Sequence, residues 1–231
     1  MICHCLALLL VVSLRGEESG AKPTINEKFR DSGLKVEEWT QKFETESREI
    51  YHHREAILKA AGIKPGLAVA DIGAGTGLFT IPFARAVGPE GVVFAVDIAP
   101  KFIDHIKTRA EKEGVGNIKP ILCTDRSTEL PEASVDVAFI CDTYHHFEHP
   151  GATLASLHRA LKPGGVLVLI DFVRIPGRSS DFVMGHVRAG QEVFEKEITT
   201  AGFEKVGEEK GLLQENYFVR FRKAEAKART P

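Results

Sequence analysis

Five aspartates stand where short apolar runs of the sequence end. They are Asp71, Asp97, Asp125, Asp142 and Asp171. A carboxylate can accept charge-assisted hydrogen bonds from the hydroxyl or amino groups of a ligand, and open α/β sheets bind ligands beyond the carboxyl ends of their parallel strands. These five of the thirty-two acidic residues are therefore the candidate ligand contacts. Asp142 and Asp171 have an alternative use, because an aspartate there can cap the following segment by accepting backbone N–H bonds.

The segment 142–149, Asp-Thr-Tyr-His-His-Phe-Glu-His, carries the side chains best suited to move a proton. Tyr144, His145 and His146 are the candidates, the histidines because imidazole titrates near neutral pH. The alternative is structural: one histidine packs against an aromatic neighbour and another hydrogen-bonds a loop carbonyl. On a helix, i, i+4 pairs within this segment would also suit a metal ion. Pro150 and the position after an apolar run favour a loop, so the sequence predicts no metal site.

A glycine-rich turn lies between two apolar runs, the second of which ends in Asp97. Such a strand, turn, helix and strand form a βαβ unit that can hold a nucleoside. A dinucleotide fingerprint would place a third glycine where this sequence has Leu78. The alternating pattern instead favours a ligand without a pyrophosphate. The turn carries Gly73, Gly75 and Gly77.

With Asp71 in front of it, this turn resembles the first motif of the class I S-adenosylmethionine-dependent methyltransferases, an acidic residue followed by G-x-G-x-G. Segments 121–125, 130–142 and 161–171 match later motifs of that family in the same order. The resemblance covers roughly residues 57–222 and leans toward the methyltransferase type 11 group that contains quinone-biosynthesis enzymes. It implies an α/β, Rossmann-like, doubly wound sheet of seven mostly parallel strands, ordered 3-2-1-4-5 at first and completed by a C-terminal antiparallel hairpin.

The resemblance also implies roles for individual residues. The glycine loop would face the methionyl moiety of S-adenosyl-L-methionine, Asp97 would accept from the ribose hydroxyls, and Asp125 would accept from the adenine amino group beside the Arg126 amide. Residues that face both the sulfonium and the acceptor would follow the fourth strand, in the stretch Tyr144 to His146. The implied cofactor contacts are Asp71, Gly73, Gly75, Gly77, Asp97, Ile98, Asp125, Arg126 and Asp142.

The function implied is transfer of a methyl group to a small-molecule acceptor by in-line displacement, in which alignment supplies much of the rate. Two alternatives stay open: a catalytically silent nucleoside-binding module, and a nucleotide-dependent oxidoreductase, which Leu78 disfavours. A formal charge of −2 and scattered basic residues argue against a nucleic-acid substrate. The acceptor is expected near segment 174–188, which includes Phe182, Met184 and His186.

Apolar runs predict parallel strands at 68–72, 92–97, 118–123, 135–141 and 166–172, and a final pair at 203–210 and 215–222. Long helical stretches are expected over 35–61 and 181–201. In the implied sheet order Cys123 and Cys141 lie about 14 Å apart, three strand spacings, which is too far for a disulfide.

Four regions follow from these patterns: a leader over 1–21, a helical cap over 22–60, the S-adenosylmethionine-binding domain over 61–223 and a flexible tail over 224–231. The apolar block 1–14 is too short for a membrane anchor and could be a secretory signal, although no basic residue precedes it. A cytoplasmic location, or the cytosolic membrane face, is favoured, with export and weak membrane association left open. The cap, including Tyr51-His52-His53, is expected to close the cofactor mouth; the oligomeric state is not predicted.

Overall fold

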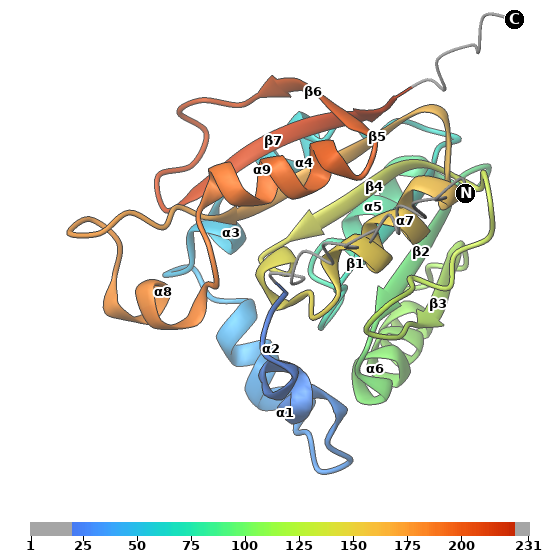
Figure 1. The fold of residues 1–231 in the computed structure, drawn as a ribbon. Helices are drawn as coiled ribbons and strands as arrows, with labels where there is room; N and C mark the ends of the chain where they lie inside the picture. Colours follow the sequence, from blue (N-terminus) through green and yellow to red (C-terminus); the bar gives the residue numbers. More distant parts are fainter. Residues whose placement is uncertain (1–19, 225–231) are drawn as a thin grey trace, which may run out of the picture.

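The computed structural model describes residues 20–224, and its centre is one seven-stranded sheet of order β3-β2-β1-β4-β5-β7-β6 (Figure 1). The first five strands of that order run parallel, whereas β7 pairs antiparallel with both β5 and β6. This confirms the predicted fold class, sheet order and final hairpin. The strands are β1 (Ala68–Ile72), β2 (Val92–Asp97), β3 (Ile118–Leu122), β4 (Val135–Cys141), β5 (Leu161–Phe172), β6 (Phe203–Glu208) and β7 (Asn216–Lys223).

Helices cover both faces of the sheet, which is why the central strands read as continuous apolar runs. Leu154 and Phe194, from helices on one face, pack with Ala70 of β1, whereas Ile57 and Phe83, from helices on the other, pack with Val69. The helices are α1 (Glu27–Arg30), α2 (Val36–Phe43), α3 (Glu49–His52), α4 (Arg54–Ala60), α5 (Thr80–Val87), α6 (Pro100–Lys112), α7 (Pro150–Ala160), α8 (Asp181–His186) and α9 (Gln191–Thr200), with 3-10 turns η1 (Pro23–Asn26) and η2 (Tyr144–His146).

Both long helices predicted from the sequence are interrupted, so those two predictions are wrong in extent. The stretch 35–61 forms α2, α3 and α4, because the chain turns after Phe43 and the Arg48 guanidinium donates to the Phe43 carbonyl at 3.2 Å. The stretch 181–201 forms α8 and α9. It is divided at Gly190, which has an extended conformation and precedes the first residue of α9.

Strand β5 begins five residues earlier than predicted. Leu161 pairs with Val135 and Val166 pairs with Val137, so the proline and glycines between them form an irregularity inside the strand instead of preceding it. Gly164 accommodates this with a φ of +73°.

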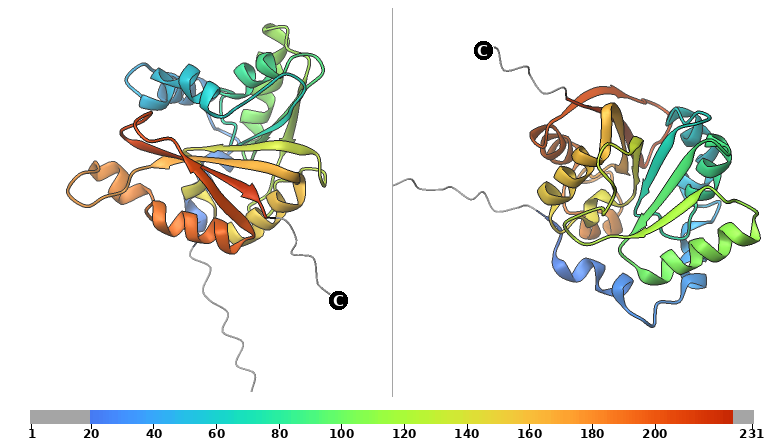
Figure 2. Two further views of the ribbon diagram at one scale, coloured as in Figure 1. Left: turned by 90° about the horizontal axis from the view of Figure 1, so that it is seen from above. Right: turned by 90° about the vertical axis from the view of Figure 1, so that its right-hand side faces the viewer.

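Residues 20–52 form a cap at the end of the sheet where β1, β2 and β4 finish, and Figure 2 shows its blue helices beside α6, whereas Ile57 of α4 packs on a face of the sheet. The backbone amide of Ala21 donates to the Phe147 carbonyl at 2.8 Å. None of the helices between residues 20 and 224 is long and apolar enough to cross a membrane. The predicted leader lies outside the described residues except for residues 20 and 21, and the predicted tail lies outside them except for residue 224.

Candidate functional site

A cavity of about 650 Å³ lies between the cap and the carboxyl ends of the central strands, a size within the usual range of small-molecule sites. The structure brings eight of the predicted site residues to its wall: Gly73, Gly75, Asp97, Ile98, Asp125, Asp142, His145 and His146. The cap adds Asn26, Lys28, Phe29, Trp39, Lys42, Phe43 and Arg48. Phe147, Phe172, Phe182 and His186 also line the cavity.

The glycine turn is held close to the ends of two neighbouring strands. The Gly73 amide donates to the Val96 carbonyl at 2.8 Å, and a side chain at Gly73 would collide with Thr143. Gly75 has a φ of +55°, and a Cβ there would lie 3.4 Å from the Phe43 ring of the cap. The turn therefore presents bare backbone to the cavity, because a larger residue would fill the narrow space below α2.

Asp97 ends β2 with both carboxylate oxygens turned to backbone amides. Oδ2 accepts from Gly75 N and Oδ1 accepts from Ala99 N, both at 2.8 Å. Burial raises the pKa of this carboxyl to about 6, although these amide donors act to lower it. Each oxygen keeps lone-pair capacity toward the cavity, so the residues present fit the ribose hydroxyls of an adenosyl group.

Three of the residues assigned to the cofactor are not among the residues that line the cavity. The Asp71 carboxylate accepts from Thr80 Oγ1 at 2.6 Å, and burial raises its pKa to about 7. It therefore holds the start of α5. Gly77 faces Ile106 of α6, and the Arg126 amide donates to Thr124 Oγ1 at 3.2 Å within a turn. Direct cofactor contact is not supported by these placements.

Tyr144, one of the three predicted catalytic residues, also points away from the cavity lining. Its side chain is fully buried between Phe147 and Phe194, and its hydroxyl donates to Glu197 at 2.9 Å. Burial raises the pKa of Tyr144 well above its ordinary value, and the Glu197 charge raises it further. The sequence could not reveal this orientation, because Glu197 lies 53 positions away on α9.

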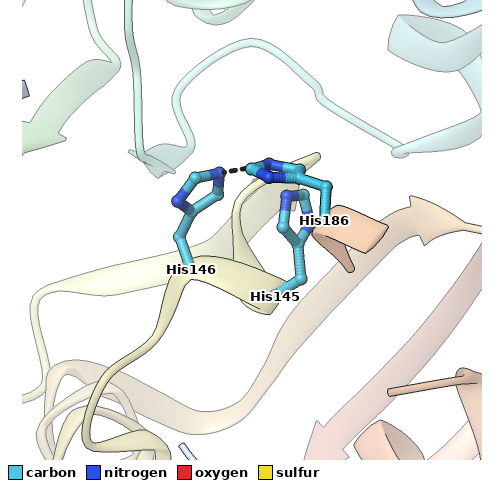
Figure 3. A group of neighbouring side chains, drawn as sticks. All are labelled: His145, His146 and His186. Carbon is cyan, nitrogen blue, oxygen red and sulfur yellow. Dashed lines mark hydrogen bonds between the residues drawn. The ribbon is translucent and has the colours of Figure 1, made fainter. Parts of the chain in front are cut away.

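His145 and His146 do face the cavity, and His186 of α8 joins them (Figure 3). The ring of His145 bonds through Nδ1 to Asp171 Oδ1 at 2.8 Å, and Nε2 of His146 lies 3.2 Å from Nε2 of His186. Burial lowers the pKa of His146 to about 2 and also lowers that of His186, with nearby basic side chains adding to both effects. Both rings are therefore neutral near pH 7.

Asp142 connects the cap to the sheet, which the sequence did not predict. Its carboxylate bonds to the guanidinium of Arg48 and accepts from Asn216 Nδ2 at 2.6 Å. Burial raises the Asp142 pKa, and the Arg48 charge opposes that shift. The residue has a φ of +49°, an uncommon conformation for a side chain other than glycine. Tyr51, His52 and His53 of the predicted cap are not among the residues that line the cavity.

His186 lay inside the segment predicted to be near the acceptor, whereas Arg48 carried no distinguishing signal. His186 follows Phe182 by four residues, and the two rings stack at 5.0 Å between centroids on α8. Cys123 and Cys141 are both free thiols, as the predicted strand separation requires.

Sheet order and cavity position define a Rossmann-like protein with its cleft where the strand order reverses. A family model described as a methyltransferase domain matches residues 69–165. The chain is 34% identical over 116 residues to the ubiquinone/menaquinone biosynthesis C-methyltransferase UbiE of Burkholderia orbicola, a match covering 50% of this chain and 47% of that relative. The chain thus matches about half the length of such curated relatives.

Solved structures support the same fold. An S-adenosylmethionine-dependent methyltransferase from Aquifex aeolicus superposes with a TM-score of 0.70 at 23% identity, covering 81% of this chain and 98% of that one. The [4+2]-cyclase SpnF superposes with a TM-score of 0.63 at 15% identity, covering 74% and 81%. Residues 69–165 therefore match a methyltransferase domain, and the chain has the fold of the S-adenosylmethionine-dependent enzyme from Aquifex aeolicus. S-adenosyl-L-methionine is the cofactor that this likeness implies.

Proposed function

We propose that this protein transfers a methyl group from S-adenosyl-L-methionine to a small molecule bound in the same cavity. One observation carries the proposal: a single cavity is lined both by the glycine turn with Asp97, which ends β2, and by His145 with Phe172, which ends β5. A cofactor held by the glycine turn and Asp97 would have its acceptor beside it. Neither the silent-module nor the oxidoreductase alternative is favoured by the comparisons.

The bound cofactor supplies a methyl group on a positively charged sulfur, whose carbon–sulfur bond breaks as the acceptor bonds to the methyl carbon, releasing S-adenosylhomocysteine. The chain's own residues bind and align. Asp97 holds the glycine turn through Gly75 N and offers oxygen to the ribose. Phe43 and Trp39 of the cap close the cavity from outside and exclude water from the reacting groups.

An acceptor that carries a proton must lose it, and His145 is placed to receive it. Its Nδ1 faces the Asp171 carboxylate, so the proton of the neutral ring resides on Nδ1 and Nε2 has the free lone pair. Asp171 acts as a positioning residue for this ring. A proton leaving an acceptor hydroxyl would move to His145 Nε2 in this scheme.

The acceptor we propose is a planar aromatic compound with an acidic hydroxyl. Phe147, Phe172 and Phe182 supply aromatic faces near the histidines, and Lys28 supplies a positive charge. The relatives named for ubiquinone and menaquinone biosynthesis point to the same chemical class.

The test incubates the full chain with radiolabelled cofactor and a panel of phenols, quinols and aliphatic carboxylates. We expect label in a phenol or quinol product, together with calorimetric binding of S-adenosylhomocysteine and no binding of NAD. Binding without turnover on the panel or on a metabolite extract would favour the silent module. Binding of NAD in place of S-adenosylhomocysteine would contradict the proposal altogether.

A further inference from the structure

Three imidazole rings converge at the cavity wall from two distant parts of the chain. His145 and His146 belong to η2, and His186 ends α8, forty residues after His146 in the sequence (Figure 3). One nitrogen of each ring lies within 4.8 Å of the corresponding nitrogens of the other two. Both His146 and His186 are half-buried and His145 is buried, so the group is partly shielded from solvent.

Hydrogen-bond partners behind the rings leave two of the nitrogens unprotonated. The Asp171 carboxylate faces His145 Nδ1, which places the ring proton there and frees Nε2. Asn26 Nδ2 donates to the His146 carbonyl at 3.0 Å and to Glu148 at 2.7 Å. The atom that faces His146 Nδ1, at 3.1 Å, is therefore the acceptor oxygen Oδ1, so the ring proton of His146 resides on Nδ1. His146 therefore also presents an unprotonated Nε2.

The spacing of the ring nitrogens matches shared coordination. Two histidine nitrogens about 2.0–2.1 Å from one tetrahedral ion are separated by roughly 3.3 Å. Nε2 of His146 and Nε2 of His186 are 3.2 Å apart. The hydrogen bonds to Asp171 and Asn26 are also typical of metal sites. In such sites, the N–H of the other ring nitrogen of a ligating histidine donates to a carboxylate or carbonyl oxygen.

We propose that His145, His146 and His186 bind one divalent transition-metal ion of the zinc class, leaving its fourth coordination position open to the cavity. Three neutral imidazoles suit zinc, cobalt or nickel better than magnesium or calcium, which prefer oxygen ligands. An ion held by three protein ligands with an open position is the arrangement of catalytic zinc sites. The inference rests on these side chains alone and does not depend on methyl transfer.

A bound ion would change how an acceptor is activated. Coordination uses the Nε2 lone pair of His145, so the ring could not then act as the base. An acceptor hydroxyl in the open position would instead lose its proton more readily because it binds a Lewis acid. The positive charge of Lys28, which lines the cavity, would repel such an ion. The negative charge of the buried Asp171, which bonds to His145, would attract it.

The experiment uses the untagged full chain, stripped of metal by a chelator and titrated with Co²⁺. We expect one Co²⁺ per chain, with the visible absorption of a four- or five-coordinate ion that changes when azide is added. His146→Asn and His186→Asn should each weaken binding by at least about 100-fold, and Asp171→Asn by about 10- to 100-fold. His158→Asn is the matched control, because that ring lies on α7, packs against Phe203 at 5.3 Å between centroids and is not among the residues that line the cavity.

Folding is checked in every variant by circular dichroism and by binding of S-adenosylhomocysteine. His186→Asn is the least disruptive substitution, since α8 is short and peripheral. Co²⁺ binding that persists in His146→Asn and His186→Asn, or a folded wild-type protein that gives no Co²⁺ spectrum, would overturn the site. Either result leaves the methyl-transfer proposal standing, because its test measures labelled product and cofactor binding.

Discussion

The Asp171 carboxylate accepts from His145 twice, from the backbone amide at 3.1 Å and from ring Nδ1 at 2.8 Å. Both side chains are almost completely buried. A single carboxylate therefore orients both the η2 turn and the imidazole that faces the cavity. This relationship joins β5 to the end of β4 at the centre of the candidate site.

Asp171→Asn should alter the protonation of the His145 ring. The amide offers one acceptor oxygen in place of two, so one of the bonds to His145 is lost and the free energy of unfolding should fall by about 1–3 kcal/mol. Nitrogen-15 NMR of the imidazole should show the Nδ1–H tautomer in the wild type and a mixture in the variant. An unchanged tautomer would mean that Asp171 serves folding alone.

Asp97→Ala should weaken binding of S-adenosylhomocysteine by about 10- to 100-fold, because it removes charge-assisted hydrogen bonds to the ribose and releases the Gly75 amide. Calorimetry provides the measurement. Asp104→Asn is the matched control, since Asp104 is an exposed residue of α6 that pairs with Lys107. Equal affinity in the Ala variant and the wild type would remove Asp97 from the ribose site.

Cofactor affinity should depend on pH through Asp97, whose pKa burial raises to about 6. Above that value the carboxylate is ionised and would accept from the ribose of the proposed cofactor, and below it the affinity should fall by up to about tenfold per pH unit. A titration of S-adenosylhomocysteine from pH 8 to pH 5 measures this, and Asp97→Asn should flatten the profile.

The free energy of unfolding should respond to pH in the opposite sense. A carboxyl whose pKa is raised on folding binds its proton more tightly in the folded state. For Asp71, this stabilising contribution to the free energy of unfolding is fully present below pH 3.8, the ordinary pKa of the carboxyl. It is lost as the pH rises through the folded-state pKa of about 7. Asp71→Asn, which keeps an acceptor for Thr80, should therefore lose less stability between pH 5 and pH 8 than the wild type. Denaturant titrations of both proteins at pH 5 and pH 8 measure this. Equal losses of stability in the variant and the wild type would contradict the prediction.

Gly75→Ala distinguishes two effects of a side chain in the glycine turn: filling of the space below the cap, and strain of a backbone with positive φ. Gly75 and Gly62 both have positive φ, at +55° and +72°, but only a Cβ at Gly75 meets another side chain within 4 Å across the cavity, the Phe43 ring. Both alanine variants should lose about 1 kcal/mol of stability. Only Gly75→Ala should also lose cofactor affinity, by more than about tenfold. Similar affinities in the two variants would contradict this use of the turn.

Arg48→Met should loosen the cap, because the Arg48 guanidinium is its ionic contact with Asp142. Hydrogen exchange across residues 36–52 should become faster in the variant and slower again when cofactor binds. Arg54→Met is the control, since Arg54 stacks on Tyr51 outside the cavity. Equal exchange in Arg48→Met, Arg54→Met and the wild type would show that the cap does not depend on the Arg48–Asp142 pair and is held by its other contacts, such as the Arg30–Glu148 ion pair.

The sequence by itself was sufficient to predict that the sheet has seven strands, although it placed the start of β5 five residues too late. Three strands, β1, β2 and β4, have the predicted bounds, and the glycine turn with Asp97 lies at the cavity as expected. These features depend on local patterns: apolar runs buried on both faces, glycines where φ is positive, and a carboxylate at a strand end. Nearby residues in the chain carry that information, so it can be read without the tertiary structure.

Tertiary structure alone decided which side chains meet after the strands end. Tyr144 and His145 are adjacent in η2, yet the Tyr144 hydroxyl bonds to Glu197 of α9, whereas the His145 ring lines the cavity. His186 reaches His146 only because the chain divides into α8 and α9. In a turn without a repeating pattern, a side chain's direction depends on partners far away in the sequence, and packing of whole elements brings those partners together.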